Sequence, residues 1–165
     1  MHGRSGRQPR RSGTPWASIA RLGHMHWFFG NLYEALVDVP HLLTDAQPKR
    51  EPRLLGAGSP LRYYLPFAPL TLIATVAALI DKWRSGGDRG MIALASTSTA
   101  FAAGLTAYLV RGVNLRLLQN PKPLAPNESR RLVTTWQRVN SVRLILLVVA
   151  VWALRHVGER SRPPT

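Results

Sequence analysis

The sequence of 165 residues contains no cysteine and only 8 acidic residues. The lack of cysteine excludes disulfides, thiolate metal sites, iron–sulfur clusters and Cys-x-x-Cys redox centres. Phosphate-binding loops, dinucleotide-binding glycine motifs and nucleophilic triads are also absent from the sequence. The length suits a single domain, and that domain carries none of the common signatures of soluble enzymes.

Negative charge is scarce, and the remaining charge is unevenly distributed. The 8 acids face 22 lysines and arginines, which gives a net charge of +14, yet the mean hydropathy is −0.06. Nucleic-acid binding is one use of a basic chain, but basic blocks that alternate with long uncharged runs favour a membrane surface. The sequence therefore predicts a lipid bilayer as partner and no nucleic acid.

Long uncharged runs predict membrane-spanning helices. Residues 91–110 form a run of 20 without charge, and residues 63–80 form one of 18. In residues 139–154, Arg143 is the single charged residue. A helix of 20 residues is about 30 Å long, which matches the hydrocarbon core of a bilayer. A fourth and weaker run, residues 27–43, begins at Trp27 and includes several polar side chains.

These runs predict an all-α fold, an integral membrane antiparallel four-helix bundle, because backbone polar groups in lipid must be bonded within helices. We expect a membrane domain at residues 24–156, with spans at about 27–43, 63–80, 91–118 and 136–155. Residues 1–23 and 157–165 are expected to be disordered tails. A slight excess of lysine and arginine on the side of both termini favours a cell-membrane protein with cytoplasmic ends. Ser96, Ala100 and Gly104 are expected to let another helix approach closely.

Polar side chains within the spans share helix faces. On a helix over residues 27–43, Asn31, Glu34 and Asp38 lie on one face, and Pro40 is expected to kink or end that helix. In the last span, one stripe carries Trp136, Asn140, Arg143 and Leu147. We expect both faces to turn into the bundle, where the opposite charges offset part of the cost of burial. Asn114 and Arg111 of the third span could join them.

Three segments carry a family resemblance. They are FFGNLYEALVDVP, VRGVNLRLL, and WQRVNSVRLILLVVAVWAL with its Trp-x-x-x-Asn-x-x-Arg start. In this order, the segments resemble the anthrone-oxygenase-like four-helix membrane proteins, from about Trp27 to Leu154 and most specifically from Asn114 to Arg143. Most members of that family are uncharacterised. The resemblance implies a four-helix membrane protein and, by analogy with fungal relatives, the oxygenation of anthrones to anthraquinones.

If the buried polar residues form a catalytic pocket, a lipophilic aromatic substrate and no cofactor are expected. Oxygenation without metal or flavin requires a base that leaves a substrate carbanion able to reduce O₂. Glu34 is the first candidate for this base, with Asp38 or His41 as second choices. Arg143 and Asn140 would stabilise the enolate oxygen. The residues predicted to bind substrate are Asn31, His41, Asn114 and Trp136.

Two other interpretations remain open at this stage. Glu34, Asp38 and His41 have a spacing that could bind a metal, but Pro40 interrupts the helix between the last two, so no metal is predicted. The buried charges could also form a structural ion-pair network in a non-catalytic membrane protein, such as an assembly partner or a subunit of a small-solute carrier. Direct contact between Glu34 and Arg143 without a cavity would favour the network. A cavity beside them would favour an enzyme.

Overall fold

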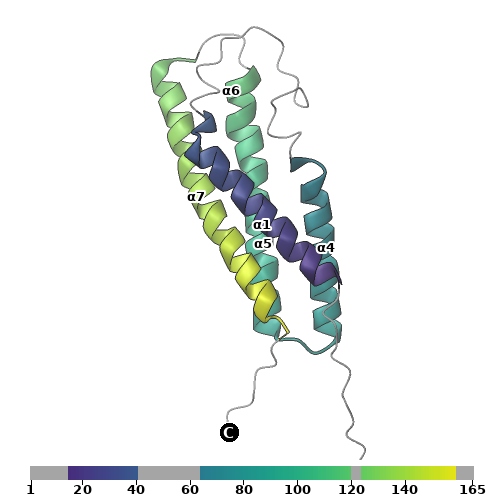
Figure 1. Ribbon diagram of the computed structural model, residues 1–165. Helices are drawn as coiled ribbons and strands as arrows, with labels where there is room; N and C mark the ends of the chain where they lie inside the picture. The colour runs from purple at the N-terminus through teal and green to yellow at the C-terminus, as the bar shows by residue number, and fades with distance from the viewer. Residues whose placement is uncertain (1–14, 41–63, 120–123, 159–165) are drawn as a thin grey trace, which may run out of the picture.

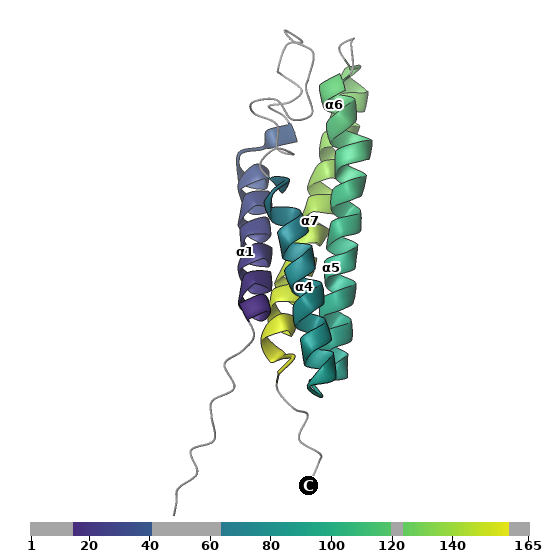
Figure 2. The ribbon, with the colours of Figure 1, turned by 90° about the vertical axis from the view of Figure 1, so that its right-hand side faces the viewer.

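The computed structural model describes residues 15–40, 64–119 and 124–158. Four long helices run side by side, each antiparallel to the next along the chain (Figure 1). They are α1 (Pro15–Leu36), α4 (Phe67–Arg84), α5 (Arg89–Leu109) and α7 (Pro126–His156). A π-helical turn, η1 (Val110–Asn114), and α6 (Leu115–Gln119) continue α5 as one rod (Figure 2). The predicted all-α four-helix bundle is confirmed.

Many small residues lie in the interior of the bundle, and many large apolar residues lie on its outside. The α1 helix packs against α4 and α7, and α5 packs mainly against α7. Interior positions with 0% exposure include Ala20, Ala74, Ala95, Ala102 and Ala150. Exposed large side chains include Phe29, Ile73, Phe101 and Ile145. A bundle in water gains stability by burying its large apolar side chains, whereas small interior residues and an apolar exterior are typical of helices packed in lipid.

Two segments are long and apolar enough to cross a membrane, namely Arg89–Leu117 and Pro126–His156. The α4 helix has only 18 residues, and its end carries Asp81, Lys82 and Arg84. These charged residues follow directly after the predicted span at 63–80. The structure therefore supports a membrane location through two of the four predicted spans.

The first helix begins earlier than predicted. It starts at Pro15, so residues 15–23 of the predicted disordered tail are helical. The reason is tertiary packing, since Ala17, Ala20 and His24 share a face of α1 that is buried against the other helices. Trp27 was expected at the start of a span, but it lies within α1 and is buried in a cluster with Ala102 and Leu147.

The first helix also ends earlier than predicted. The last residue of α1 is Leu36, four positions before Pro40. Asp38 lies beyond the helix with a φ of 51°, in the left-handed region that aspartate tolerates better than most residues. The predicted face of Asn31, Glu34 and Asp38 is therefore reduced to its first two members.

The small residues of α5 that were expected to contact another helix face outward. Ser96, Ala100 and Gly104 are exposed, and a Cβ atom built on Gly104 meets nothing within 4 Å. The buried face lies one position away and includes Ala95 and Ala102. Both rows consist of small residues, so composition alone does not separate them.

Two glycines let α1 and the chain around α4 approach closely. A Cβ atom at Gly23 would collide with the side chain of Thr71, and one at Gly30 would lie 2.5 Å from the hydroxyl oxygen of Tyr64. The two glycines are seven residues apart and face the same neighbouring segment. The close approach at Gly30 sets the position of Tyr64 beside the polar residues of α1.

Candidate functional site

A cluster of buried polar side chains joins α1, α5 and α7 within the bundle. The Nδ2 atom of Asn140 donates to the carbonyl oxygen of Asn31 at 3.2 Å, which links α7 to α1. Nη1 of Arg143 donates to the hydroxyl oxygen of Thr106 at 3.3 Å, which links α7 to α5. Asn140 and Arg143 are 1% and 4% exposed. The stripe predicted on the last span is buried as expected, with Trp136 and Leu147 at its two ends.

Arg143 is held by a neighbour one turn before it on α7. Its Nε and Nη2 atoms donate to the Oδ1 atom of Asn140 at 3.1 and 2.6 Å. A guanidinium has five N–H groups, and three of them are bonded to Asn140 and Thr106. The other two have no hydrogen-bond partner among the described residues. The cation is thus fixed in orientation and retains donors for a further acceptor.

Glu34 faces this cation from α1 without touching it. The carboxylate is partly buried and interacts with Arg143 and with the side chain of Tyr64. No direct ion pair joins Glu34 to Arg143. The two charges attract each other, and the direct contact expected of a purely structural network is not among the contacts of these described residues.

Asn31 has a buried side-chain amide with no bond. The residue is 0% exposed, and neither its Oδ1 nor its Nδ2 atom has a hydrogen-bond partner among the described residues. Its backbone carbonyl is the group that receives the bond from Asn140. Leaving a buried polar group unsatisfied costs about 1–3 kcal/mol. The amide one turn from Glu34 thus keeps its donor and acceptor capacity unused among the described residues.

Comparison with known proteins identifies the family. A family model described as anthrone oxygenase matches residues 60–153. The chain belongs to the anthrone oxygenase family. No curated protein and no solved structure matches the chain. The residues matched to the anthrone oxygenase family include Thr106, Asn140 and Arg143, whereas Asn31 and Glu34 on α1 precede them.

Trp136, Asn114 and Arg111 were also predicted for the site, and these described residues form no hydrogen bond with the cluster. Trp136 is 3% exposed and packs in an apolar cluster with Leu109, Val113 and Leu132. Asn114 lies in η1, where its Oδ1 atom is buried without a hydrogen-bond partner among the described residues. Arg111 is exposed. His41 lies outside the described residues.

Two members of the cluster were not anticipated from the sequence. Tyr64 was not among the predicted site residues, and it interacts with Glu34. Thr106 was not singled out, although it receives the bond from Arg143. Thr106 follows Thr99 by seven residues on α5, and this spacing of hydroxyl groups along one face is the signal that could have found it.

Among the residues that the structure describes, no group of three or more histidine, cysteine, aspartate or glutamate side chains could hold a metal ion. The polar side-chain groups of the cluster are two amides, a guanidinium, two hydroxyls and a single carboxylate. Such a set can take a proton and stabilise an oxyanion.

Proposed function

We propose that the protein is an intramembrane oxygenase that binds a lipophilic aromatic substrate of the anthrone type beside Glu34, Asn31 and Arg143. Membership of the anthrone oxygenase family supports this proposal. The observation that carries it is the buried side-chain amide of Asn31, which has no partner among the described residues and is linked through Asn140 to an arginine with unused donors. A substrate carbonyl is an acceptor that these groups would satisfy.

The proposed chemistry begins with a proton transfer. The Glu34 carboxylate takes a proton from the CH₂ group opposite the anthrone carbonyl, and negative charge moves onto the carbonyl oxygen as an enolate. Donors fixed in advance stabilise such charge better than water, because they need no reorganisation. Arg143 and the Nδ2 group of Asn31 would supply these donors. Asn140 acts as a positioning residue, since its Oδ1 atom holds two nitrogens of Arg143.

The electrons then pass to molecular oxygen. The electron-rich enolate transfers electrons to O₂, a C–O bond forms at the former CH₂ carbon, and the peroxide takes up the proton held by Glu34. Loss of the second proton from that carbon to Glu34 breaks the O–O bond. The hydroxide that leaves takes this proton and becomes water. One anthrone and one O₂ thus give one anthraquinone and one water, with O₂ as the only oxidant.

The test is turnover by the purified protein in detergent micelles, measured as quinone absorbance and O₂ uptake with an anthrone substrate. We expect Glu34→Gln to lower kcat by about 100-fold or more, the usual contribution of a general base. Glu128→Gln is the matched control, because Glu128 is exposed in the first turn of α7. Wild-type turnover by a folded Glu34→Gln protein would refute the base assignment. Absence of anthrone turnover by the wild-type protein would refute the proposed function.

A non-catalytic role is the second candidate. It is favoured by the bonds that Asn140 and Arg143 already make to α1 and α5, which tie three helices together. A protein of this kind would use the cluster only for assembly of the bundle. Binding of an anthrone that is sensitive to Asn31→Leu would exclude this role, because the amide of Asn31 holds no helix in place.

A further inference from the structure

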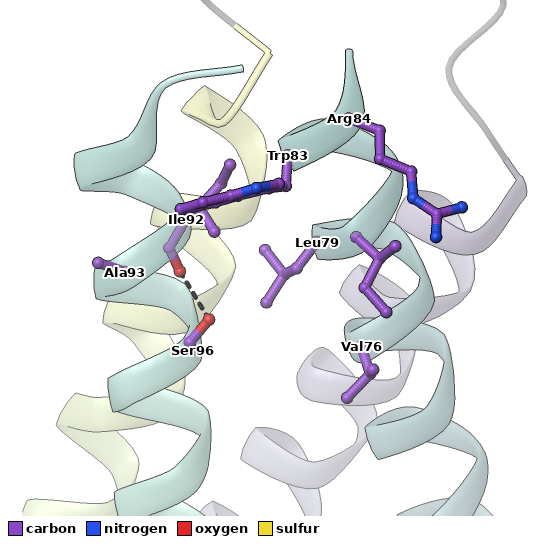
Figure 3. A pocket seen from close by; sticks show the side chains of 8 residues that line it. Val76, Leu79, Trp83, Arg84, Ile92, Ala93 and Ser96 are labelled. Atoms are coloured by element: carbon purple, nitrogen blue, oxygen red, sulfur yellow. Dashed lines mark hydrogen bonds between the residues drawn. The ribbon is translucent and has the colours of Figure 1, made fainter. Parts of the chain in front are cut away.

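A groove lies between α4 and α5, at the end of the bundle where the two helices are joined. It encloses about 410 Å³. Its floor is formed by Val76, Leu79, Ile80, Ile92 and Ala93, and Trp83 lies across its end (Figure 3). The hydroxyl of Ser96 also faces the groove, but it donates to the carbonyl oxygen of Ile92 at 2.8 Å. The groove therefore presents an apolar surface with no unsatisfied polar side chain among these residues.

Positive charge gathers at the end of the groove. Arg84, which follows Trp83 in the chain, also lines the groove, and its side chain extends to the side of α4 away from Trp83 and α5 (Figure 3). The guanidinium carbon of Arg89 lies 4.1 Å from the centre of the Trp83 ring. The nearby Asp88 carboxylate is engaged as the N-cap of α5, where it accepts from the backbone N–H of Met91 at 2.9 Å. The end of the groove thus combines two arginines with an aromatic residue of the kind found at membrane interfaces.

The groove is separate from the polar cluster beside Glu34. Ser96 in the groove and Thr106 in the cluster are ten residues apart on α5, which is about 15 Å along a helix axis. The start of α5 at Arg89 and the end of α7 at His156 are also the ends of the two candidate membrane spans. The arginines therefore lie where the hydrocarbon core would meet the headgroups, with the apolar floor on the hydrocarbon side.

We propose that this groove binds an anionic phospholipid, with one acyl chain along the apolar floor and the phosphate beside Arg84 and Arg89. The complementarity has two parts, an uncharged channel of the right chemistry for a hydrocarbon chain and a positive end of the right sign for a phosphate. A zwitterionic lipid has the same acyl chains and also carries a phosphate, but its headgroup has no net negative charge. This binding does not depend on the proposed oxygenase activity.

The experiment measures lipids retained by the purified full-length chain in native mass spectra. The probes are dioleoyl phosphatidylglycerol and dioleoyl phosphatidylcholine, which have the same acyl chains and differ in headgroup charge. We expect the wild-type protein to retain the anionic lipid preferentially, by about fivefold for each arginine. Arg84→Gln combined with Arg89→Gln should abolish this preference. Arg116→Gln combined with Arg131→Gln, at the other end of the bundle, removes equal charge and should preserve it.

A second pair of variants tests the acyl-chain channel. Ala93→Phe fills the groove and should lower retention of both lipids, whereas Ala107→Phe, on an exposed part of α5 away from the groove, should not. Both alanines are exposed, so neither change overpacks the core. Equal retention of the two lipids by the wild-type protein, or unchanged retention in Ala93→Phe, would overturn the proposal.

Discussion

His24 and Asn31 lie seven residues apart on the same face of α1, and both side chains are 0% exposed. Their bonding differs. The Nδ1 atom of His24 donates to the carbonyl oxygen of Ala20 at 2.9 Å, and its Nε2 atom is paired with the hydroxyl of Thr99 at 3.0 Å. Both nitrogens of the ring are therefore occupied. The side-chain amide of Asn31 has no hydrogen-bond partner among the described residues.

This difference separates a structural contact from a group that we propose to bind a ligand. The His24–Thr99 pair links α1 to α5 and leaves no capacity for a ligand. We call the residues around Asn31 and those around His24 two layers of the bundle. In the layer of Asn31, other groups link the helices: Asn140 donates to the Asn31 carbonyl oxygen, and Arg143 donates to Thr106. The amide of Asn31 is left over. A buried polar residue thus indicates function when its hydrogen bonds are unmade, not merely when it is polar.

The largest effect is expected at the cation of the Asn31 layer. Arg143→Met removes an oxyanion donor, a change that costs about 100- to 1,000-fold in kcat in other enzymes. It also leaves Asn140 and Thr106 without their donor, so the protein should unfold more easily in detergent. Turnover normalised to folded protein separates these two effects. An unchanged normalised kcat would place Arg143 with His24 among the structural contacts.

The second change exchanges the unbonded amide for an apolar side chain. Asn31→Leu should weaken anthrone binding by about 10- to 100-fold, which corresponds to the loss of one to two good hydrogen bonds to an acceptor. Its free energy of unfolding should stay the same or rise, because the change removes a buried polar group that has no bond to lose. Titration with an anthrone and denaturation in detergent measure the two quantities. A loss of stability without a loss of binding would contradict the comparison.

The corresponding change in the other layer should give the opposite result. His24→Leu removes both hydrogen bonds of the ring, so the free energy of unfolding should fall by about 1–3 kcal/mol, with anthrone turnover per folded protein preserved. Thr99→Val provides a double-mutant cycle, since the two residues share one bond and their effects should not add. A turnover defect in His24→Leu would show that this layer also takes part in the chemistry.

The sequence predicted the class of fold and the buried face of α7 because both depend on local patterns. Long uncharged runs indicate spanning helices, and residues three and four apart on one helix share a face whatever surrounds them. Asn140 and Arg143 could therefore be predicted as neighbours within α7, and they are bonded. The partner of Arg143 on α5 lies 37 residues away in the chain, and a local pattern carries no information about it.

The errors in the predicted helices have the same origin. The start of α1 at Pro15 depends on packing of Ala17 and Ala20 against other helices, which a local pattern does not reveal. The two small-residue faces of α5 are alike in sequence, and only the position of α7 decides which is buried. Asp38 departs from the helix through a left-handed conformation that the helical spacing did not predict.

The smallest effects are expected at the two glycines that precede His24 and Asn31 in the chain. At Gly23, an added methyl group meets the Cβ atom of Thr71, which is fixed to the backbone. Overpacking of this kind costs about 1–3 kcal/mol, and the better helix propensity of alanine offsets up to about 1 kcal/mol of it, so Gly23→Ala should destabilise the protein slightly. At Gly30, the methyl group meets only the hydroxyl end of the Tyr64 side chain, which can move.

Gly30→Ala should therefore leave the free energy of unfolding nearly unchanged while shifting the Tyr64 hydroxyl away from Glu34. The expected result is a few-fold change in kcat in Gly30→Ala and none in Gly23→Ala. The free energy of unfolding should instead fall in Gly23→Ala and stay nearly unchanged in Gly30→Ala. Gly104→Ala is the control for helix propensity, because nothing lies within 4 Å of its added methyl group. If both glycine variants changed only stability, the residues around Asn31 would be as purely structural as those around His24, because a catalytic carboxylate would respond to displacement of its neighbour Tyr64.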